Sequence, residues 1–242
     1  MDLLILGGGY GKRLFGEYNP KMYIPKGLIK IKCKHCIDYT LETFSNCLID
    51  KIILETNNEG EKFYRGWSNE SRFKENKEIF IDKLSTPNNV LGVLSTINLV
   101  NNYYNFKEPI LIVAPDNIFT RNQDELITGF IKGARMAAYE TDSLMNAKKY
   151  GVLELSSNKI ISCCEKPTNP KSKIIRTSCE IWDQEIFLMI SKWIDKNDPD
   201  KVGDFINFLI NQNIRIESFI IKGEWIDMGS VEDLNKVRVM FG

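Results

Sequence analysis

The sequence contains one histidine, has no long apolar run and carries no excess of either charge. His35 stands alone, without residues that would form a catalytic triad around it, which argues against hydrolysis by a histidine-activated nucleophile. No segment is apolar over the length that a bilayer requires. The 32 Lys and Arg residues balance the 32 Asp and Glu residues, so the chain has no general attraction to nucleic acid or to acidic membranes. We therefore expect a cytoplasmic protein that binds neither nucleic acid nor a membrane.

The chain of 242 residues contains six cysteines. Six cysteines at irregular spacing do not form the framework of a small disulfide-rich domain. Cys33 and Cys36 make a single C-x-x-C pair, whereas a structural zinc site needs a second pair of ligands at suitable spacing. We therefore expect reduced thiols and no zinc site.

Short apolar segments alternate with helical patterns through the first part of the chain. This alternation favours a mostly parallel central sheet flanked by helices, and the length suits a single domain, residues 1–242. The strands are expected at residues 3–6, 51–56, 78–82 and 109–114, and the helices at residues 37–47, 61–74, 91–102 and 123–139.

The pattern changes after residue 140 and becomes rich in strands. Two short runs separated by Ser156-Ser157-Asn158 predict a hairpin. We therefore expect a β-rich insertion in an α/β domain. Its strands are expected at residues 150–155, 159–164, 174–182 and 214–221, and its helices at residues 184–193, 202–211 and 230–239.

A glycine-rich loop follows the first expected strand, in the segment Leu6-Gly7-Gly8-Gly9-Tyr10-Gly11-Lys12-Arg13. Glycines let backbone N–H groups approach an anion closely, and the lysine and arginine add charge that suits phosphate. The alternative is a plain turn, because the loop has neither the P-loop spacing nor the acidic residue of a dinucleotide site. The pattern indicates a site for nucleotide phosphates.

Two carboxylates, Asp116 and Asp227, follow apolar strands that lie far apart in the sequence. Ligands gather at the carboxyl ends of strands in an open α/β sheet, and Mg²⁺ prefers one or two carboxylates together with phosphate oxygens. The alternative is that both residues belong to turns or helix caps. Near the amino terminus, Lys21 and Lys26 each follow a proline, and either could reach a phosphate.

Taken together, the ordered blocks of the chain resemble the sugar-1-phosphate nucleotidylyltransferases, the family of glucose-1-phosphate thymidylyltransferase. The resemblance implies a Rossmann-like nucleotidyltransferase fold of the GT-A type, covers nearly the whole chain, and rests on the order of six blocks rather than on any single one. These blocks are residues 6–14, residues 26–39, Pro115-Asp116-Asn117-Ile118-Phe119, Tyr150-Gly151-Val152, Glu165-Lys166-Pro167 and Trp225-Ile226-Asp227-Met228-Gly229.

The resemblance assigns residues 1–140 to the nucleotide. Arg13 would neutralise the nucleotide phosphates and the departing pyrophosphate, and Lys26, whose spacing to Lys34 fits the family better than that of Lys21, would hold the α-phosphate. Asp116 and Asp227 would bind Mg²⁺. The nucleotide site would further include Leu6, Gly7, Gly8, Gly9, Gly11, Lys12, Gly92 and Asp116.

Residues 141–242 would bind the phosphorylated acceptor, through Tyr150, Gly151, Glu165 and Lys166. The implied reaction is in-line attack of the acceptor's phosphate oxygen on the α-phosphorus of a nucleoside triphosphate, with release of pyrophosphate. The nucleophile is already an anion, so catalysis rests on positioning and charge neutralisation.

Departures from the family pattern leave the base and the acceptor open. Lys12 replaces a threonine, Pro87 falls where thymidylyltransferases carry a base-reading glutamine, and Ser178 falls where a glycine lines the sugar pocket. One alternative is a cytidylyltransferase acting on phosphocholine or a phosphorylated amino-acid derivative. Others are a catalytically silent relative and a glycosyltransferase, although the latter would usually show an Asp-x-Asp motif. A homo-oligomer is left open.

Overall fold

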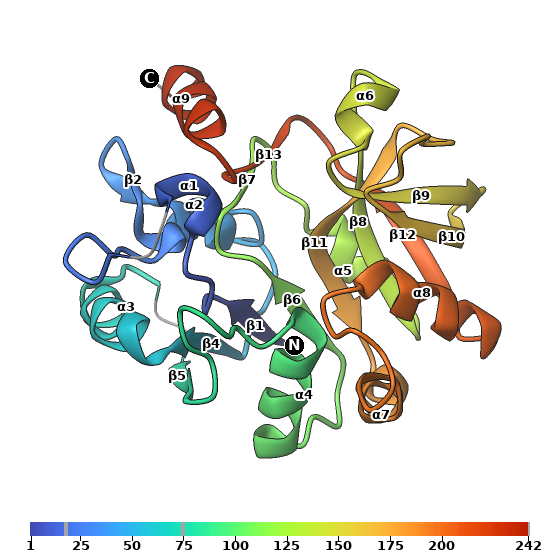
Figure 1. Ribbon diagram of the computed structural model, residues 1–242, viewed down its shortest axis with the longest axis horizontal. Coiled ribbons are helices and arrows are strands. Elements are labelled where there is room, and N and C mark those ends of the chain that lie inside the picture. Colours follow the sequence, from blue (N-terminus) through green and yellow to red (C-terminus); the bar gives the residue numbers. More distant parts are fainter. Residues whose placement is uncertain (17–18, 74–75, 242) are drawn as a thin grey trace. The chain divides into compact units, whose positions relative to one another are not determined.

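The computed structural model describes residues 1–16, 19–73 and 76–241, with the side chain of Arg13 left aside. The chain forms two compact units, and it passes between them several times (Figure 1). Unit 1 comprises Met1–Val90, Ile112–Asp124 and Lys222–Gly242, and unit 2 comprises Leu91–Leu111 and Glu125–Ile221. The proposed functional halves, residues 1–140 and 141–242, remain a prediction.

Unit 1 is built on parallel strands that lie in the order β5-β4-β1, with β6 next to β1. The apolar residues of β1 and β4 form its buried core, as expected for parallel strands covered on both faces. The elements of unit 1 are β1 (Asp2–Leu6), α1 (Lys12–Phe15), the 3-10 turn η1 (Lys26–Leu28), β2 (Lys30–Ile31), β3 (Lys34–His35), α2 (Cys36–Glu42), β4 (Lys51–Asn57), α3 (Asn58–Glu70), β5 (Asn76–Asp82), β7 (Asn117–Phe119), β13 (Trp225–Asp227) and α9 (Val231–Met240); β6 (Ile110–Val113) spans the boundary with unit 2.

A small antiparallel pair, β7 with β13, brings the last part of the chain back into unit 1. It packs in a buried cluster with α2 and α9 that includes Cys36, Ile118 and Met228. Ser230 is the N-cap of the last helix, α9, and its hydroxyl oxygen accepts a hydrogen bond from the Asp233 N–H (3.2 Å), a common N-cap arrangement. This packing fixes Asp227 at the end of β13.

Unit 2 contains a mixed sheet in the order β11-β8-β12-β10-β9. The β8–β12 pair is parallel and the others are antiparallel. The aromatic rings of Trp182, Phe187 and Phe205 pack within its core. The elements of unit 2 are α4 (Val93–Tyr104), α5 (Glu125–Thr128), β8 (Ala134–Glu140), α6 (Leu144–Ala147), β9 (Gly151–Ser156), β10 (Lys159–Glu165), β11 (Ile174–Trp182), α7 (Gln184–Ile194), α8 (Val202–Asn211) and β12 (Ile216–Ile220).

The helix expected at residues 123–139 is wrong. Only Glu125–Thr128 is helical, and Ala134–Glu140 is a strand, β8. Gly133, at φ 76°, turns the chain between them, in a conformation that favours glycine. The alanines of β8 favour a helix locally, but pairing with β11 and β12 on its two sides overrides that preference.

The other expected elements are present, most with shifted ends, and β11 and α8 have the expected bounds; the α/β class is confirmed. Helix α2 is the most shortened, since it ends at Glu42 rather than at residue 47. The predicted hairpin is the β9–β10 pair, with Ser156 opposite Lys159. Among the described residues, no helix has the length and apolar character needed to cross a membrane.

Candidate functional site

The glycine loop leaves β1 at Leu6 and is tied at once to β4. Gly7 N–H donates to the Glu55 carbonyl oxygen (2.8 Å), and Gly8 N–H donates to Glu55 Oε2 (3.1 Å). The Asn57 side-chain amide donates to the Gly8 carbonyl oxygen (2.7 Å). The loop is therefore held at the carboxyl end of the parallel strands, where ligands bind in open α/β sheets.

Gly11 ends the loop and begins α1. It has φ 65°, and its carbonyl oxygen accepts from the N–H groups of Leu14 (2.9 Å) and Phe15 (3.0 Å). Lys12 in this short helix is exposed. Arg13 follows it in α1, but the predicted role of its side chain lies outside the part of the molecule that the structure describes.

Lys26 and Asp116 form an ion pair between Nζ and Oδ2, although 90 residues separate them in the sequence. Both side chains are largely buried, with 17% and 11% of their surface exposed. The residues next to this pair also approach closely, since a Cβ at Gly27 would lie 2.7 Å from the Pro115 Cβ. Lys21, by contrast, is exposed, so the structure brings only the predicted phosphate lysine to the predicted metal ligand.

Asp227 lies beside the same segment. It pairs with Asn117 across the β7–β13 ladder, and the Met228 N–H donates to the Asp116 carbonyl oxygen (3.1 Å). The Trp225 indole N–H donates to Asn117 Oδ1 (2.5 Å) and fixes the ladder further. The backbones that carry the two predicted metal ligands are thus held next to each other.

These residues fit a magnesium ion that also takes oxygens from its substrate. Two carboxylates on neighbouring backbones offer oxygen ligands only, which is the preference of Mg²⁺. Within the described residues no group of three or more His, Cys, Asp or Glu side chains is arranged to hold a metal. The protein alone therefore supplies a partial ligand set, as is usual for Mg²⁺ bound together with phosphates.

The four predicted acceptor residues lie together in unit 2. Glu165 ends β10 opposite Gly151, and Glu165 Oε1 accepts from the Gly203 N–H at the start of α8 (3.0 Å). Lys166 N–H donates to the Tyr150 carbonyl oxygen (3.0 Å). A positive φ of 43° at Lys166 turns the chain as it leaves the strand, and its side chain is exposed.

Gly92, predicted to approach a nucleoside, is the N-cap of α4 in unit 2. A Cβ at this position would lie 2.8 Å from the Pro199 carbonyl carbon, and Leu94 N–H donates to the Pro199 carbonyl oxygen (3.1 Å). Close packing within unit 2 therefore accounts for the glycine, and its contact with a nucleoside stays a prediction.

Sequence reasoning missed Glu55, Asn57 and Tyr64, which surround the glycine loop. Burial, with a smaller contribution from Asp82, raises the pKa of Glu55 from 4.5 to about 8 against the lowering effect of the Gly8 N–H. The signal in the sequence was a glutamate inside an apolar strand, which is rare without a specific role. Tyr64 is fully buried, and its hydroxyl has no hydrogen-bond partner among the described residues.

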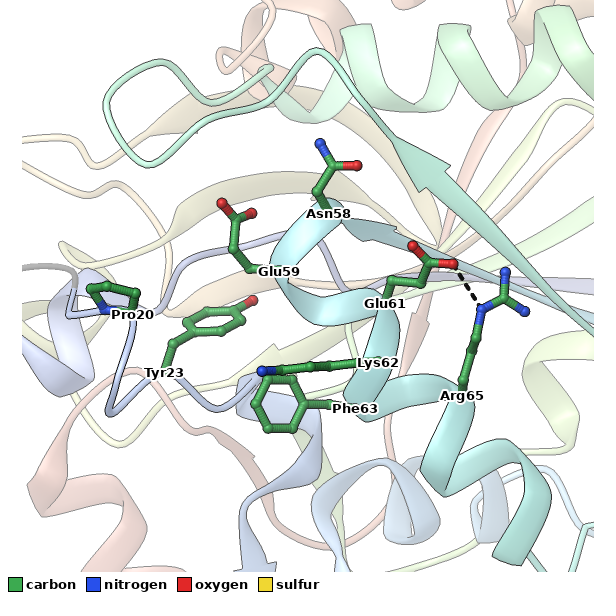
Figure 2. A pocket seen from close by; sticks show the side chains of 8 residues that line it. All are labelled: Pro20, Tyr23, Asn58, Glu59, Glu61, Lys62, Phe63 and Arg65. Atoms are coloured by element: carbon green, nitrogen blue, oxygen red, sulfur yellow. Dashed lines mark hydrogen bonds and ion pairs between the residues drawn. The ribbon is translucent and has the colours of Figure 1, made fainter.

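A separate cavity of about 420 Å³ opens in unit 1 beside the start of α3 (Figure 2). Figure 2 shows Tyr23 and Phe63 close together, with the Lys62 side chain beside the Phe63 ring, and the Lys62 Nζ lies 4.8 Å from the ring centre. Glu61 accepts from Arg65 Nε–H (2.8 Å) at its edge. None of the predicted site residues lines this cavity.

Comparison with known proteins identifies the family to which this chain belongs. The family model for nucleotidyl transferases matches residues 3–240, so the chain belongs to that family. It is similar to the bifunctional protein GlmU of Methanocaldococcus jannaschii, with 28% identity over 238 residues that cover 97% of this chain and 52% of the relative. It is also similar to glucose-1-phosphate thymidylyltransferase of Streptomyces antibioticus, with 24% identity over 245 residues that cover 98% of this chain and 65% of the relative.

Solved structures agree with the fold. A UDP-glucose pyrophosphorylase in complex with UDP-glucose aligns with a TM-score of 0.81 at 19% identity, covering 99% of this chain and 97% of the other. The inositol-1-phosphate CTP transferase of T. maritima aligns with a TM-score of 0.77 at 14% identity, covering 99% and 94%. The chain spans between about half and two thirds of the curated relatives named above. The predicted family and fold are confirmed.

Proposed function

We propose that the protein couples a nucleoside triphosphate to a sugar 1-phosphate, giving a nucleotide sugar and pyrophosphate. The observation that carries this proposal is the buried Lys26–Asp116 pair, held next to the Asp227 backbone in the unit that contains the glycine loop. A cation and two carboxylates at the ends of strands are what a triphosphate with its metal ion requires. The similarity to a glucose-1-phosphate thymidylyltransferase and to a UDP-glucose pyrophosphorylase supports the choice of reaction.

Lys26 would act on the α-phosphate. Its ammonium group, now paired with Asp116, carries a positive charge that can meet the charge that builds up on the α-phosphoryl oxygens during in-line displacement. Arg13 and the loop backbone would neutralise the β- and γ-phosphates that leave as pyrophosphate. No general base is required, because the attacking phosphate oxygen is already ionised.

Asp116 and Asp227 would hold Mg²⁺, which would supply Lewis-acid polarisation of the phosphoryl oxygens and a fixed geometry for the leaving group. In the protein alone the Asp116 carboxylate is neutralised by Lys26. With Asp116 serving as a metal ligand, Lys26 would be available to the substrate phosphate. Metal and triphosphate are therefore expected to bind together.

Glu165 and Lys166 would bind the acceptor. The Glu165 carboxylate uses one oxygen on the Gly203 N–H and keeps acceptor capacity for sugar hydroxyls. The exposed ammonium of Lys166 suits the acceptor's phosphate. This division predicts that the two residues affect the acceptor rather than the triphosphate.

The test is a pyrophosphate-release screen with Mg²⁺. ATP, CTP, GTP, UTP and dTTP are each combined with glucose 1-phosphate, mannose 1-phosphate, N-acetylglucosamine 1-phosphate and phosphocholine. We expect release with one sugar 1-phosphate and its preferred triphosphate. As controls, Asp116→Asn should abolish release and Glu217→Gln, a buried carboxyl on β12 that pairs with Arg215, should preserve it.

The outcomes separate the alternatives. Release of pyrophosphate only with CTP and phosphocholine would show that the acceptor is a non-sugar phosphate, while the reaction type would stay as proposed. Triphosphate binding without release for any acceptor would favour a catalytically silent relative. Release that persists in Asp116→Asn would contradict the site proposed here.

A further inference from the structure

Side chains at the carboxyl end of β4 hold both backbone polar groups of Gly8. The Gly8 N–H donates to Glu55 Oε2 (3.1 Å), and the Asn57 amide donates to the Gly8 carbonyl oxygen (2.7 Å). The preceding Gly7 N–H donates to the Glu55 carbonyl oxygen (2.8 Å). The shape of the glycine loop is thus set by β4, and the Gly8 N–H is turned into the protein rather than toward a ligand.

Glu55 is an unusual residue for this position because it is buried and lacks a cation. Only 2% of it is exposed, and among the described residues it makes no ion pair. The titratable groups that face it are Asp82 at the end of β5 and Tyr64 on α3. Burial and the Asp82 charge raise the pKa of Glu55 to about 8, so the carboxyl group is mostly uncharged at neutral pH.

The loop is accessible at Gly9. A Cβ at this position would have no atom of the described residues within 4 Å, and Gly9 is exposed. With the Gly8 N–H engaged by Glu55, an anion would approach the loop from the Gly9 side. The loop therefore has one face fixed by β4 and one face accessible to phosphate.

We propose that Glu55 is a positioning residue for the triphosphate, which holds the backbone N–H of Gly8 so that the Gly9 face of the loop can receive phosphate. This inference rests on the proposed function. The uncharged acid accepts the Gly8 N–H without repelling the nucleotide. An ionised Glu55 would place a poorly screened negative charge one hydrogen bond from an anion-binding backbone, so triphosphate affinity should fall as Glu55 loses its proton.

The experiment measures triphosphate binding directly. Isothermal titration calorimetry gives the Kd of ATP, CTP, GTP, UTP and dTTP, each with excess Mg²⁺, between about pH 7 and about pH 9. If only the uncharged acid allows binding, the competent fraction falls from about 0.9 to about 0.1, so Kd should rise roughly tenfold. Glu55→Gln keeps an acceptor for the Gly8 N–H and cannot ionise, so its Kd should stay nearly constant.

Two further variants complete the test. Glu217→Gln removes a buried carboxyl in unit 2. This variant should keep the tenfold rise in Kd, because the nucleotide and the lysines titrate in it as they do in the wild type. Glu55→Met keeps the side-chain length but removes the acceptor, and should bind triphosphate more weakly than Glu55→Gln at both pH values. Circular dichroism checks that each variant is folded; if Glu55→Met does not fold, the comparison of wild type with Glu55→Gln decides alone.

An equal rise in Kd for wild type and Glu55→Gln, or no rise in wild type, would overturn the positioning role while leaving the proposed function intact. Failure of the wild-type protein to bind any of the five triphosphates at either pH would instead refute the proposed function, and the positioning role would fall with it.

Discussion

Replacement of Glu55 by glutamine should change how stability depends on pH. The folded protein keeps the Glu55 proton up to about pH 8, whereas an unfolded glutamate loses it near 4.5. Between these values the unfolded state binds fewer protons than the folded state, so the free energy of unfolding falls as pH rises. The stabilisation is fully present below the unfolded pKa and is lost as pH rises through the folded pKa.

The size of the effect follows from the two pKa values. Their difference of about 3.5 corresponds to about 5 kcal/mol, which is comparable with the whole stability of many domains. Glu55→Gln has no titrating group at this position. Its free energy of unfolding should therefore approach or exceed that of the wild type as pH rises. At acidic pH the wild type should become more stable relative to the variant.

Urea unfolding of wild type and Glu55→Gln, followed by fluorescence at several pH values, measures this difference by linear extrapolation. Other titrating groups cancel in the comparison, and Glu217→Gln controls for loss of a buried carboxyl. A difference between the two proteins that changes by less than about 1 kcal/mol between about pH 4 and about pH 9 would refute the reasoning, because an ordinary Glu55 pKa produces no such change.

Three predictions concern the proposed reaction. Asp116→Asn and Asp227→Asn should each lower kcat by about 100-fold or more in Mg²⁺, with unchanged circular dichroism; near-normal turnover of both would reject the metal assignment. Lys26→Ala should lose about 2–4 kcal/mol of transition-state stabilisation, measured from kcat/KM, whereas Lys21→Ala should resemble wild type, and the reverse order would disprove the assignment. Lys166→Ala should raise KM for the acceptor far more than KM for the triphosphate, and equal increases would contradict its assignment to the acceptor.

Much of the fold could be predicted because local pattern and tertiary packing agree. The hairpin of β9 and β10 has a polar turn between two apolar runs, and the structure forms it where the pattern indicates. Residues 123–139 show the opposite case. Their alanines favour a helix, but β8 lies between β11 and β12, and sequence alone does not reveal which strands will flank a segment.

The candidate site divides in the same way. The types of its residues could be predicted, since a glycine loop, a lysine and strand-end carboxylates each have a chemical reason. The contacts between these residues could not be predicted, because the Lys26–Asp116 pair joins residues 90 positions apart. The close approach of Gly27 to Pro115, next to this pair, is also not visible in the sequence. A sequence pattern can identify both residues of such a pair without showing that they are in contact in the folded chain.

The three consecutive glycines of the loop illustrate why motif reasoning stops short of mechanism. A Cβ at Gly7 would lie 2.9 Å from the Tyr64 hydroxyl oxygen, and one at Gly8 would overlap Glu55 Oε1, whereas one at Gly9 would meet nothing within 4 Å. Two of the glycines are therefore required by groups buried beneath the loop, and only Gly9 is left to serve a ligand that approaches from outside. A phosphate-binding motif read from sequence treats the three as equivalent. In the folded chain, the buried carboxyl and phenol groups account for the first two, which is why a glutamate inside a strand carries as much information about this loop as the glycines themselves.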